Sequence, residues 1–231
     1  TDTGGSIRIP ASLCGIIGFK PTFGRVSLHG VMPLSWNLDH AGPMTRSVRD
    51  AALMLNAMAG YDSCDPVAVD VPVEDYAKIT EASLKCVRIG LAEAFYLEMV
   101  NEEIASAIRE AASLFQSLGA EVESVDVSWL DDAYQANALM TPADGAAYHH
   151  ERLEKTPDVY GEDILRRLQT GAAYSSTEYI LARRTQTEMK HRLAQFFNKY
   201  DLLILPSTAV TAPPIEGPDA VAQAKLLTRF T

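Results

Sequence analysis

The amino-acid sequence predicts an α/β fold, and three observations favour that class. A strand candidate at 87–91, an amphipathic helix candidate at 101–118 and an alternating strand pattern at 122–127 follow one another. This order is typical of a crossover unit with two parallel strands. An apolar run at 200–205 predicts another strand, and the pattern from 130 to 199 is mostly helical. We therefore expect strands covered by helices.

The first 80 residues predict short elements joined by loops. Thr45 or Ser47 is placed to cap a helix, because each hydroxyl precedes an apolar pattern with helical spacing. Gly60 is expected to end that helix. The elements expected here are a helix at 7–15, a short buried strand at 16–19, a helix at 48–59 and an exposed loop at 62–80.

The segment 130–199 predicts a helical layer or lid of about three helices. Breaks are expected near Pro142, at 157–161 and around 171–176, where proline, glycine or serine interrupts the pattern. The run Leu202–Leu205 that follows is apolar throughout. Such a run favours a strand that is buried on both faces.

Length and composition predict a globular chain with a sizeable core. The 231 residues are 47% hydrophobic and no linker divides them, so 1–231 is expected to be part of a single domain. The formal net charge of −10 disfavours nucleic acid and anionic membranes as partners. The sequence has no spanning apolar stretch and no signal-peptide pattern, and its three cysteines, odd in number and without a close pair, make a reducing cytoplasm the expected location. Homo-oligomerisation stays open.

Cysteine usage and motif content predict neither a metal nor a cofactor. Cys14, Cys64 and Cys86 are odd in number and lack metal-ligand spacing, which disfavours a disulfide framework and a structural zinc. Cys14 is expected to pack as a small apolar residue. The sequence contains no phosphate-binding loop, no zinc-protease motif and no dinucleotide fingerprint.

The glycine turn in Thr1–Ala11 is the candidate functional site. Ser6 follows two adjacent glycines, and its hydroxyl is placed to attack a carbonyl while nearby amides hold the oxyanion. Taken alone, Gly-Gly-Ser also fits an ordinary loop in which Asp2 or Thr3 caps a helix. The candidate set is Ser6 as nucleophile, the amides of Thr3, Gly4 and Gly5 as oxyanion donors, and Asp2 and Arg8 as an ion pair that supports the turn.

The pattern continues far beyond the glycines. Residues 2–11 read Asp-Thr-Gly-Gly-Ser-Ile-Arg-x-Pro-Ala, residues 14–27 read Cys-Gly-x-x-Gly-Phe-Lys-Pro-Thr-x-Gly-Arg-Val-Ser, and residues 39–46 read Asp-His-x-Gly-Pro-Met-Thr-Arg. These segments closely resemble the core of the amidase signature family, whose members are serine hydrolases of amides. Residues 200–208 and 212–214 resemble its C-terminal part. The resemblance implies a mixed central β-sheet covered by helices on both faces, incomplete at both ends of this chain.

The resemblance also implies which base activates the serine. The relatives use a lysine that acts through a second serine with a cis peptide bond. Both residues precede the glycine turn, so this chain is expected to be a portion that lacks them. Lys20 does not take the role, because its Lys-Pro-Thr context matches a structural position of the family. The alternative is a triad of Ser6, His40 and Asp39, although consecutive residues place the acid behind the ring only with difficulty.

Three functions stay open on the sequence. The first is hydrolysis of a small-molecule carboxamide through a serine acyl-enzyme, releasing ammonia or an amine. The second is the glutaminase component of a tRNA-dependent amidotransferase; that component usually has glutamine where His40 stands, and the segment 33–40 resembles stand-alone amidases more closely. The third is a non-catalytic fragment that retains the scaffold. Trp36 is a weaker candidate for lining the substrate pocket and fits a core position equally well.

Overall fold

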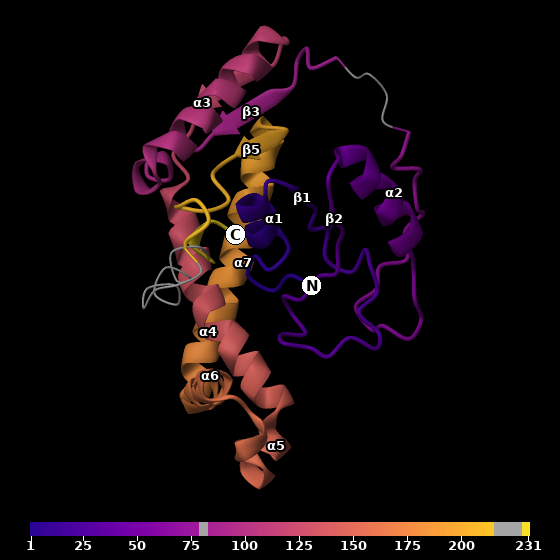
Figure 1. Cartoon of the computed structure of the whole chain (residues 1–231), viewed down its shortest axis with the longest axis vertical. Helices are drawn as coiled ribbons and strands as arrows, with labels where there is room; N and C mark the ends of the chain where they lie inside the picture. The colour runs from indigo at the N-terminus through magenta and orange to yellow at the C-terminus, as the bar shows by residue number, and fades with distance from the viewer. Residues whose placement is uncertain (79–82, 215–227) are drawn as a thin grey trace.

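The computed structural model describes residues 1–78, 83–214 and 228–231. Helices and a parallel sheet build this part of the chain, so the α/β class is confirmed (Figure 1). The helices are α1 (Arg8–Cys14), α2 (Val48–Met58), α3 (Glu102–Ser117), α4 (Asp131–Tyr148), α5 (His150–Lys155), α6 (Glu162–Ala173) and α7 (Ser176–Lys199). The strands are β1 (Ile17–Gly18), β2 (Met44–Thr45), β3 (Arg88–Leu91), β4 (Glu121–Ser124) and β5 (Leu202–Ile204). Short 3-10 turns are η1 (Leu97–Met99), η2 (Ser128–Leu130), η3 (Pro157–Val159) and η4 (Thr228–Phe230).

A three-stranded parallel sheet has β3 at its centre, between β4 and β5. The predicted crossover unit is confirmed, because β3, α3 and β4 follow in order and β3 pairs with β4 in parallel. Strand β4 ends at Ser124, earlier than the predicted end at 127. Val127 is buried in the core but does not pair with a neighbouring strand. Strand β5 lies at the other edge and its Leu202 is 49% exposed, so the prediction of burial on both faces was wrong there.

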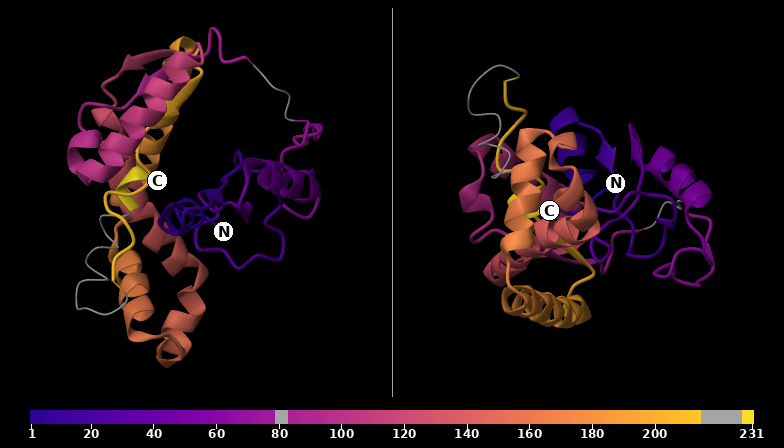
Figure 2. Two further views of the ribbon diagram at one scale, coloured as in Figure 1. Left: turned by 45° about the horizontal axis from the view of Figure 1, so that its top comes forward. Right: turned by 90° about the horizontal axis from the view of Figure 1, so that it is seen from below.

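Helices cover both faces of this sheet. On one face Leu91 packs with Ala105 and Ala112 of α3. Gly90 points to the other face, where a Cβ on it would stand 2.7 Å from the ring of Phe196 in α7. Strands β1 and β2 pair in antiparallel orientation and form a second, separate sheet among the described residues. The resemblance implied a single mixed sheet, and in the described part of the chain the parallel and antiparallel pairs belong to different sheets. The segment 1–78 that contains this pair lies beside the long helices in both views of Figure 2.

The elements of the first 78 residues match the predicted positions closely. Helix α1 ends at Gly15, which has a left-handed φ of 65°. Ser47, not Thr45, caps α2: its hydroxyl accepts a hydrogen bond from the Asp50 amide at 3.1 Å. The described part of the predicted loop, 62–78, contains no helix or strand. Cys14 is exposed, so the prediction that it packs as a small apolar residue was wrong; it is the last residue of α1 and faces solvent.

The helical segment consists of α4, α5, α6 and α7, and the long helices α4 and α7 pack side by side (Figure 1). The predicted breaks at 157–161 and 171–176 are confirmed, and a capping box of Ser175 and Glu178 starts α7. The break near Pro142 was wrong, since α4 runs through it. A Cβ at Gly171 of α6 would overlap the Pro142 carbonyl, so a close helix contact supports α4 there. Within the described ranges, no helix is both long and apolar enough to cross a membrane.

Candidate active site

The glycine turn is closed by the carboxylate of Asp2, which is completely buried. Its two oxygens accept hydrogen bonds from the backbone N–H groups of Gly5 at 2.9 Å, Ile7 at 3.1 Å and Arg8 at 3.4 Å. Such bonds satisfy amides that lack a partner at the start of a helix. Asp2 therefore holds both the turn and the first residues of α1.

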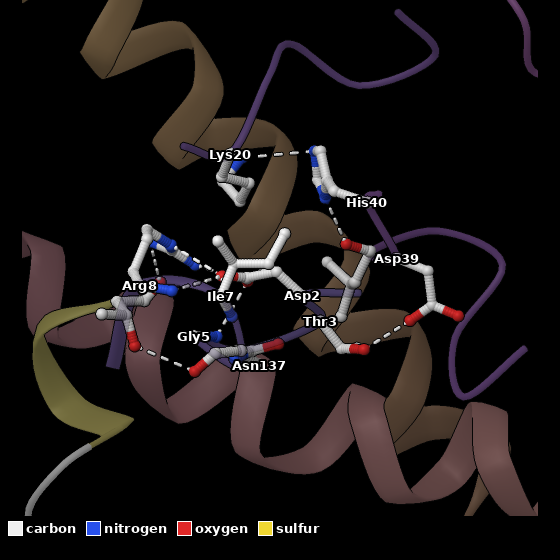
Figure 3. Close-up of polar contacts among 12 residues, drawn as sticks. Asp2, Thr3, Gly5, Ile7, Arg8, Lys20, Asp39, His40 and Asn137 are labelled. Carbon is white, nitrogen blue, oxygen red and sulfur yellow. Dashed lines mark hydrogen bonds and ion pairs between the residues drawn. The ribbon is translucent and has the colours of Figure 1, made fainter. Parts of the chain in front are cut away.

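Arg8 binds the same carboxylate through its side chain (Figure 3). Its Nε donates to Asp2 Oδ2 at 3.0 Å and its Nη2 to Asp2 Oδ1 at 2.8 Å, while Nη1 donates to the carbonyl of Thr231 at 2.8 Å. Burial would raise the pKa of Asp2, but the hydrogen bonds and charge of Arg8 and the backbone donors lower it to about 2. The predicted pair of Asp2 and Arg8 forms and carries a charged carboxylate.

Ser6 lies at the exposed side of this turn, directly after Gly5, whose φ of 120° suits glycine alone. Among the described residues, neither its hydroxyl nor its amide has a hydrogen-bond partner, and the amides of Thr3 and Gly4 have none either. The amide of Gly5 differs, because it already donates to Asp2. The free donors around Ser6 are thus the amides of Thr3, Gly4 and Ser6 itself.

His40 pairs with the turn through its backbone. The Asp2 amide donates to the His40 carbonyl at 2.8 Å and the His40 amide donates back at 2.9 Å. In the ring, Nδ1 lies 2.6 Å from the Leu38 carbonyl and Nε2 lies 3.2 Å from Nζ of Lys20. Burial first, and then the neighbouring Lys20 charge, lower the pKa of His40. These two contacts fit a ring in which Nδ1 donates to the Leu38 carbonyl and Nε2 accepts from Lys20.

Asp39 does not stand behind the His40 ring. Its carboxylate accepts from the hydroxyl of Thr3 and from the amides of Leu34 and Ser35, at 2.8 and 3.1 Å. Both ring nitrogens of His40 are occupied by other groups, as Figure 3 shows. The geometry of the alternative triad is absent from the described part of the chain.

A cavity of ≈ 320 Å³ lies between the turn and helices α4 and α7. Thr3 and Arg8 line it from the turn, and Asn137 lines it from α4. The side-chain amide nitrogen of Asn137 lies 3.0 Å from where a Cβ on Gly4 would stand. Sequence reasoning missed Asn137, since a single asparagine inside an amphipathic helix carries no motif; only the packing of α4 against the turn places it here.

Trp36 lies outside this cavity. The residue is 51% exposed, and its ring meets the ring of Tyr148 edge to face, with centroids 5.8 Å apart. It lines two other surface pockets, one of them next to Asp144. The structure thus places Trp36 neither in the core nor beside the turn.

The segment that contains Trp36 is fixed to the helices by a buried polar cluster. The carboxylate of Asp144, in α4, accepts hydrogen bonds from the hydroxyl of Ser35 and from the Tyr179 hydroxyl at 2.6 Å. Asn37 donates to it from the same segment at 3.2 Å. Burial, and then the bond to Asp144, raise the pKa of Tyr179 to about 12. The cluster joins α4, α7 and the segment that leads to His40.

Metal-binding geometry is not found in the described ranges, which hold no group of three or more His, Cys, Asp or Glu side chains placed to bind an ion. The three cysteines are exposed and unpaired.

Comparison with known proteins decides the family. The sequence model of the Amidase family matches residues 1–231. The chain belongs to the amidase family. An amidase of Pseudomonas putida is 38% identical over 239 residues, which cover 100% of this chain and 51% of that relative. The A component of the glutamyl-tRNA(Gln) amidotransferase of Geotalea daltonii is 36% identical over 230 residues, covering 89% and 47%.

The amidase fold is confirmed by solved structures as well. The A component of the glutamyl-tRNA(Gln) amidotransferase of Thermotoga maritima superposes with a TM-score of 0.84 at 30% identity, covering 100% of this chain and 50% of that one. The chain thus spans about half the length of the relatives it matches. The family inferred from the glycine turn and the segments after it is correct.

Proposed function

We propose that this chain carries the nucleophile and the oxyanion-binding amides of a serine amide hydrolase. The observation that supports this most directly is the turn itself: Ser6 is exposed, while the amides of Thr3, Gly4 and Ser6 have no acceptor among the described residues. Free donors around a nucleophile stabilise the charge that develops on a substrate carbonyl oxygen. Membership of the amidase family supports a carboxamide C–N bond as the bond that is cleaved.

The proposed reaction has two stages. Oγ of Ser6 attacks the carbon of a carboxamide, and the oxyanion formed accepts hydrogen bonds from the free amides of the turn. The C–N bond then breaks, and ammonia or an amine leaves with a proton. Water hydrolyses the acyl-enzyme, which releases the carboxylic acid and restores the Ser6 hydroxyl.

Asp2 and Arg8 act as positioning residues in this scheme. The carboxylate of Asp2 accepts hydrogen bonds from the backbone amides of Gly5, Ile7 and Arg8. It therefore fixes the backbone of the turn and with it the orientation of the free amide N–H groups. The base that receives the serine proton is expected to be the lysine and bridging serine of the family. His40 is a poor substitute, because both of its ring nitrogens are engaged.

Labelling with a serine-directed fluorophosphonate tests the nucleophile. A longer protein that contains this chain together with the lysine and bridging serine of the family is expected to gain one adduct, on the peptide that contains Ser6, and to release ammonia or an amine from members of an amide panel. Ser6→Ala is expected to lose both signals, and Ser12→Ala, which changes an exposed serine of α1, is expected to keep both. Hydrolysis that survives in Ser6→Ala would contradict the proposal. A folded protein without label or hydrolysis would favour the non-catalytic scaffold.

A second candidate is the glutaminase component of an amidotransferase, because the A component of such an enzyme is 36% identical to this chain. Histidine at position 40 argues for the stand-alone amidase, since the amidotransferase component usually has glutamine there. Glutamine hydrolysis that depends on a tightly copurifying partner and rises with tRNA would favour the second candidate.

A further inference from the structure

The two halves of the glycine turn are held by different carboxylates. The side chain of Asp2 binds only the second half, through three backbone amides between Gly5 and Arg8. It makes no bond to the amides of Thr3 and Gly4, which come earlier in the turn and have no acceptor among the described residues. Another group therefore has to hold the half that contains these two free donors.

The side chain of Asp39 contacts that first half. Its carboxylate accepts a hydrogen bond from the hydroxyl of Thr3, and the residue is only 4% exposed (Figure 3). Next to this contact, the backbones of Asp2 and His40 exchange two hydrogen bonds, of 2.8 and 2.9 Å. The start of the turn is thus joined to residues 39–40 by one side-chain bond and two backbone bonds.

The peptide groups at the start of the turn are held unequally. The Asp2–Thr3 group contains the Asp2 carbonyl, which accepts from the His40 amide, and the Gly4–Gly5 group contains the Gly5 amide, which donates to Asp2. The group between them carries the Thr3 carbonyl and the free Gly4 N–H, and neither has a partner among the described residues. Gly4 lacks a Cβ and leaves the backbone free to rotate, so Thr3 has to supply the restraint.

The bond to Asp39 supplies this restraint. Only χ1 separates the hydroxyl of Thr3 from its main chain, and branching at Cβ restricts that rotation, so a bound hydroxyl also fixes the backbone of Thr3. Asp39 is itself anchored, because it accepts from the amides of Leu34 at 2.8 Å and Ser35 at 3.1 Å. The hydroxyl of Ser35 donates to Asp144, which connects the anchor to the long helix α4.

We propose that Asp39 is a positioning residue for amide hydrolysis, which binds the Thr3 hydroxyl and so directs the N–H groups of Thr3 and Gly4 toward the substrate oxyanion. This inference rests on the proposed function, because it takes these amides as the oxyanion donors. Donors that are already aligned stabilise the transition state more than the bound substrate. Misaligned donors should therefore lower the acylation rate and leave substrate affinity unchanged.

Threonine variants test the bond in a longer protein that contains this chain together with the lysine and bridging serine of the family. Thr3→Val removes the hydroxyl at nearly constant shape, and single-turnover acylation is expected to fall about tenfold to a hundredfold. Thr3→Ser keeps the hydroxyl and is expected to recover most of the rate. The matched control is Thr187→Val, at an exposed position of α7, which is expected to acylate normally. Normal acylation in Thr3→Val would overturn the proposal.

A double-mutant cycle tests the partner. Asp39→Asn replaces one acceptor oxygen with an NH₂ group and is expected to slow acylation at least as much as Thr3→Val. The double variant is expected to be no slower than Asp39→Asn alone, because the bond can be lost only once. Fully additive losses would overturn the proposal. If Asp39→Asn does not fold, the comparison of Thr3→Val with Thr3→Ser decides the question.

A transition-state mimic separates positioning from a purely structural role. An alkyl boronic acid adds to a serine hydroxyl and forms a tetrahedral adduct, one oxygen of which takes the place of the oxyanion. Thr3→Val is expected to weaken boronate inhibition by about the same factor as acylation. In the Ser6→Ala background, Thr3→Val is expected to leave the Kd of an uncleaved amide unchanged. An equal loss of amide binding would overturn the proposal.

The outcomes distinguish this inference from the proposed function. Unchanged protein whose Ser6 takes up no fluorophosphonate would contradict both together. Normal labelling of Ser6 in the unchanged protein, combined with normal acylation in Thr3→Val, would overturn the role of Asp39 alone.

Discussion

Asp2 and Arg8 lie on opposite sides of the glycine turn and form a bidentate ion pair, in which both carboxylate oxygens accept a hydrogen bond from the guanidinium group. Arg8 donates to Asp2 Oδ2 at 3.0 Å and to Oδ1 at 2.8 Å, and the same oxygens accept from backbone amides of the turn. The carboxylate is fully buried and the Arg8 side chain is 26% exposed, so water screens the pair less than it screens a surface ion pair. The pair connects the stability of the fold to the shape of the candidate active site.

Acid is expected to destabilise the protein through Asp2. Its pKa in the folded protein is about 2, below the ordinary value of 3.8. The stabilisation is therefore complete above pH 4 and is lost as the pH falls through 2, with a size of about 2 kcal/mol in the free energy of unfolding. Urea unfolding at a series of pH values between 2 and 7 measures this loss.

Asp2→Asn is the control for the acid effect. The exposed Asp201 also has a pKa lowered to about 2, through hydrogen bonds from Arg88, and it titrates in the same range. The difference in unfolding free energy between the unchanged chain and Asp2→Asn isolates the Asp2 contribution. A difference that stays constant between pH 2 and 5 would contradict this role of Asp2.

Tyr179→Phe is expected to destabilise the contact between α7, α4 and the segment before His40. The change removes the hydroxyl that donates to the buried Asp144 carboxylate at 2.6 Å. Loss of a hydrogen bond to a buried charged group costs about 1.5–3 kcal/mol. Thermal unfolding measures the cost, and Tyr61→Phe, at a position 57% exposed, provides the matched control. Equal effects of the two changes would mean that the Asp144 cluster adds no stability.

Gly18→Ala is expected to disturb the support beneath the turn. A Cβ on Gly18 would stand 2.7 Å from the Ile7 carbonyl oxygen and 2.6 Å from the Cβ of Ala11, so α1 would have to shift. Crowding of this kind costs about 1–3 kcal/mol. It should also reduce fluorophosphonate labelling of Ser6. Gly161→Ala serves as control, because the nearest atom there is a side-chain oxygen of Asp163 at 3.3 Å; labelling equal in both variants would argue against this coupling.

His40→Gln is expected to keep the acylation rate within about tenfold of that of the unchanged protein. Both nitrogens of the His40 ring are bound to other groups, so the ring contributes no base to Ser6. Single-turnover acylation should fall by less than about tenfold in His40→Gln and disappear in Ser6→Ala. Loss as large as that of Ser6→Ala would restore the triad as the mechanism.

Local elements could be predicted because their signals are local. The stripe of apolar residues over 101–118 and the Ser47 cap each lie within a few turns of one helix, and the structure has α3 and α2 there. The error at Pro142 has the opposite cause. Proline weakens a helix in isolation, but α6 and α7 pack on α4 from distant parts of the sequence and hold it together.

The sequence by itself determined the family, the α/β class, the position of the glycine turn and the pairing of Asp2 with Arg8, because these depend on residue types at short, fixed spacing. Only the tertiary structure decided that the Gly5 amide donates a hydrogen bond to Asp2 and that Asp39 accepts one from Thr3 instead of contacting the His40 ring. It also placed Lys20 and Asn137 at the same cavity. These relationships join residues that are close in space through chain reversals and helix packing, which no local pattern encodes.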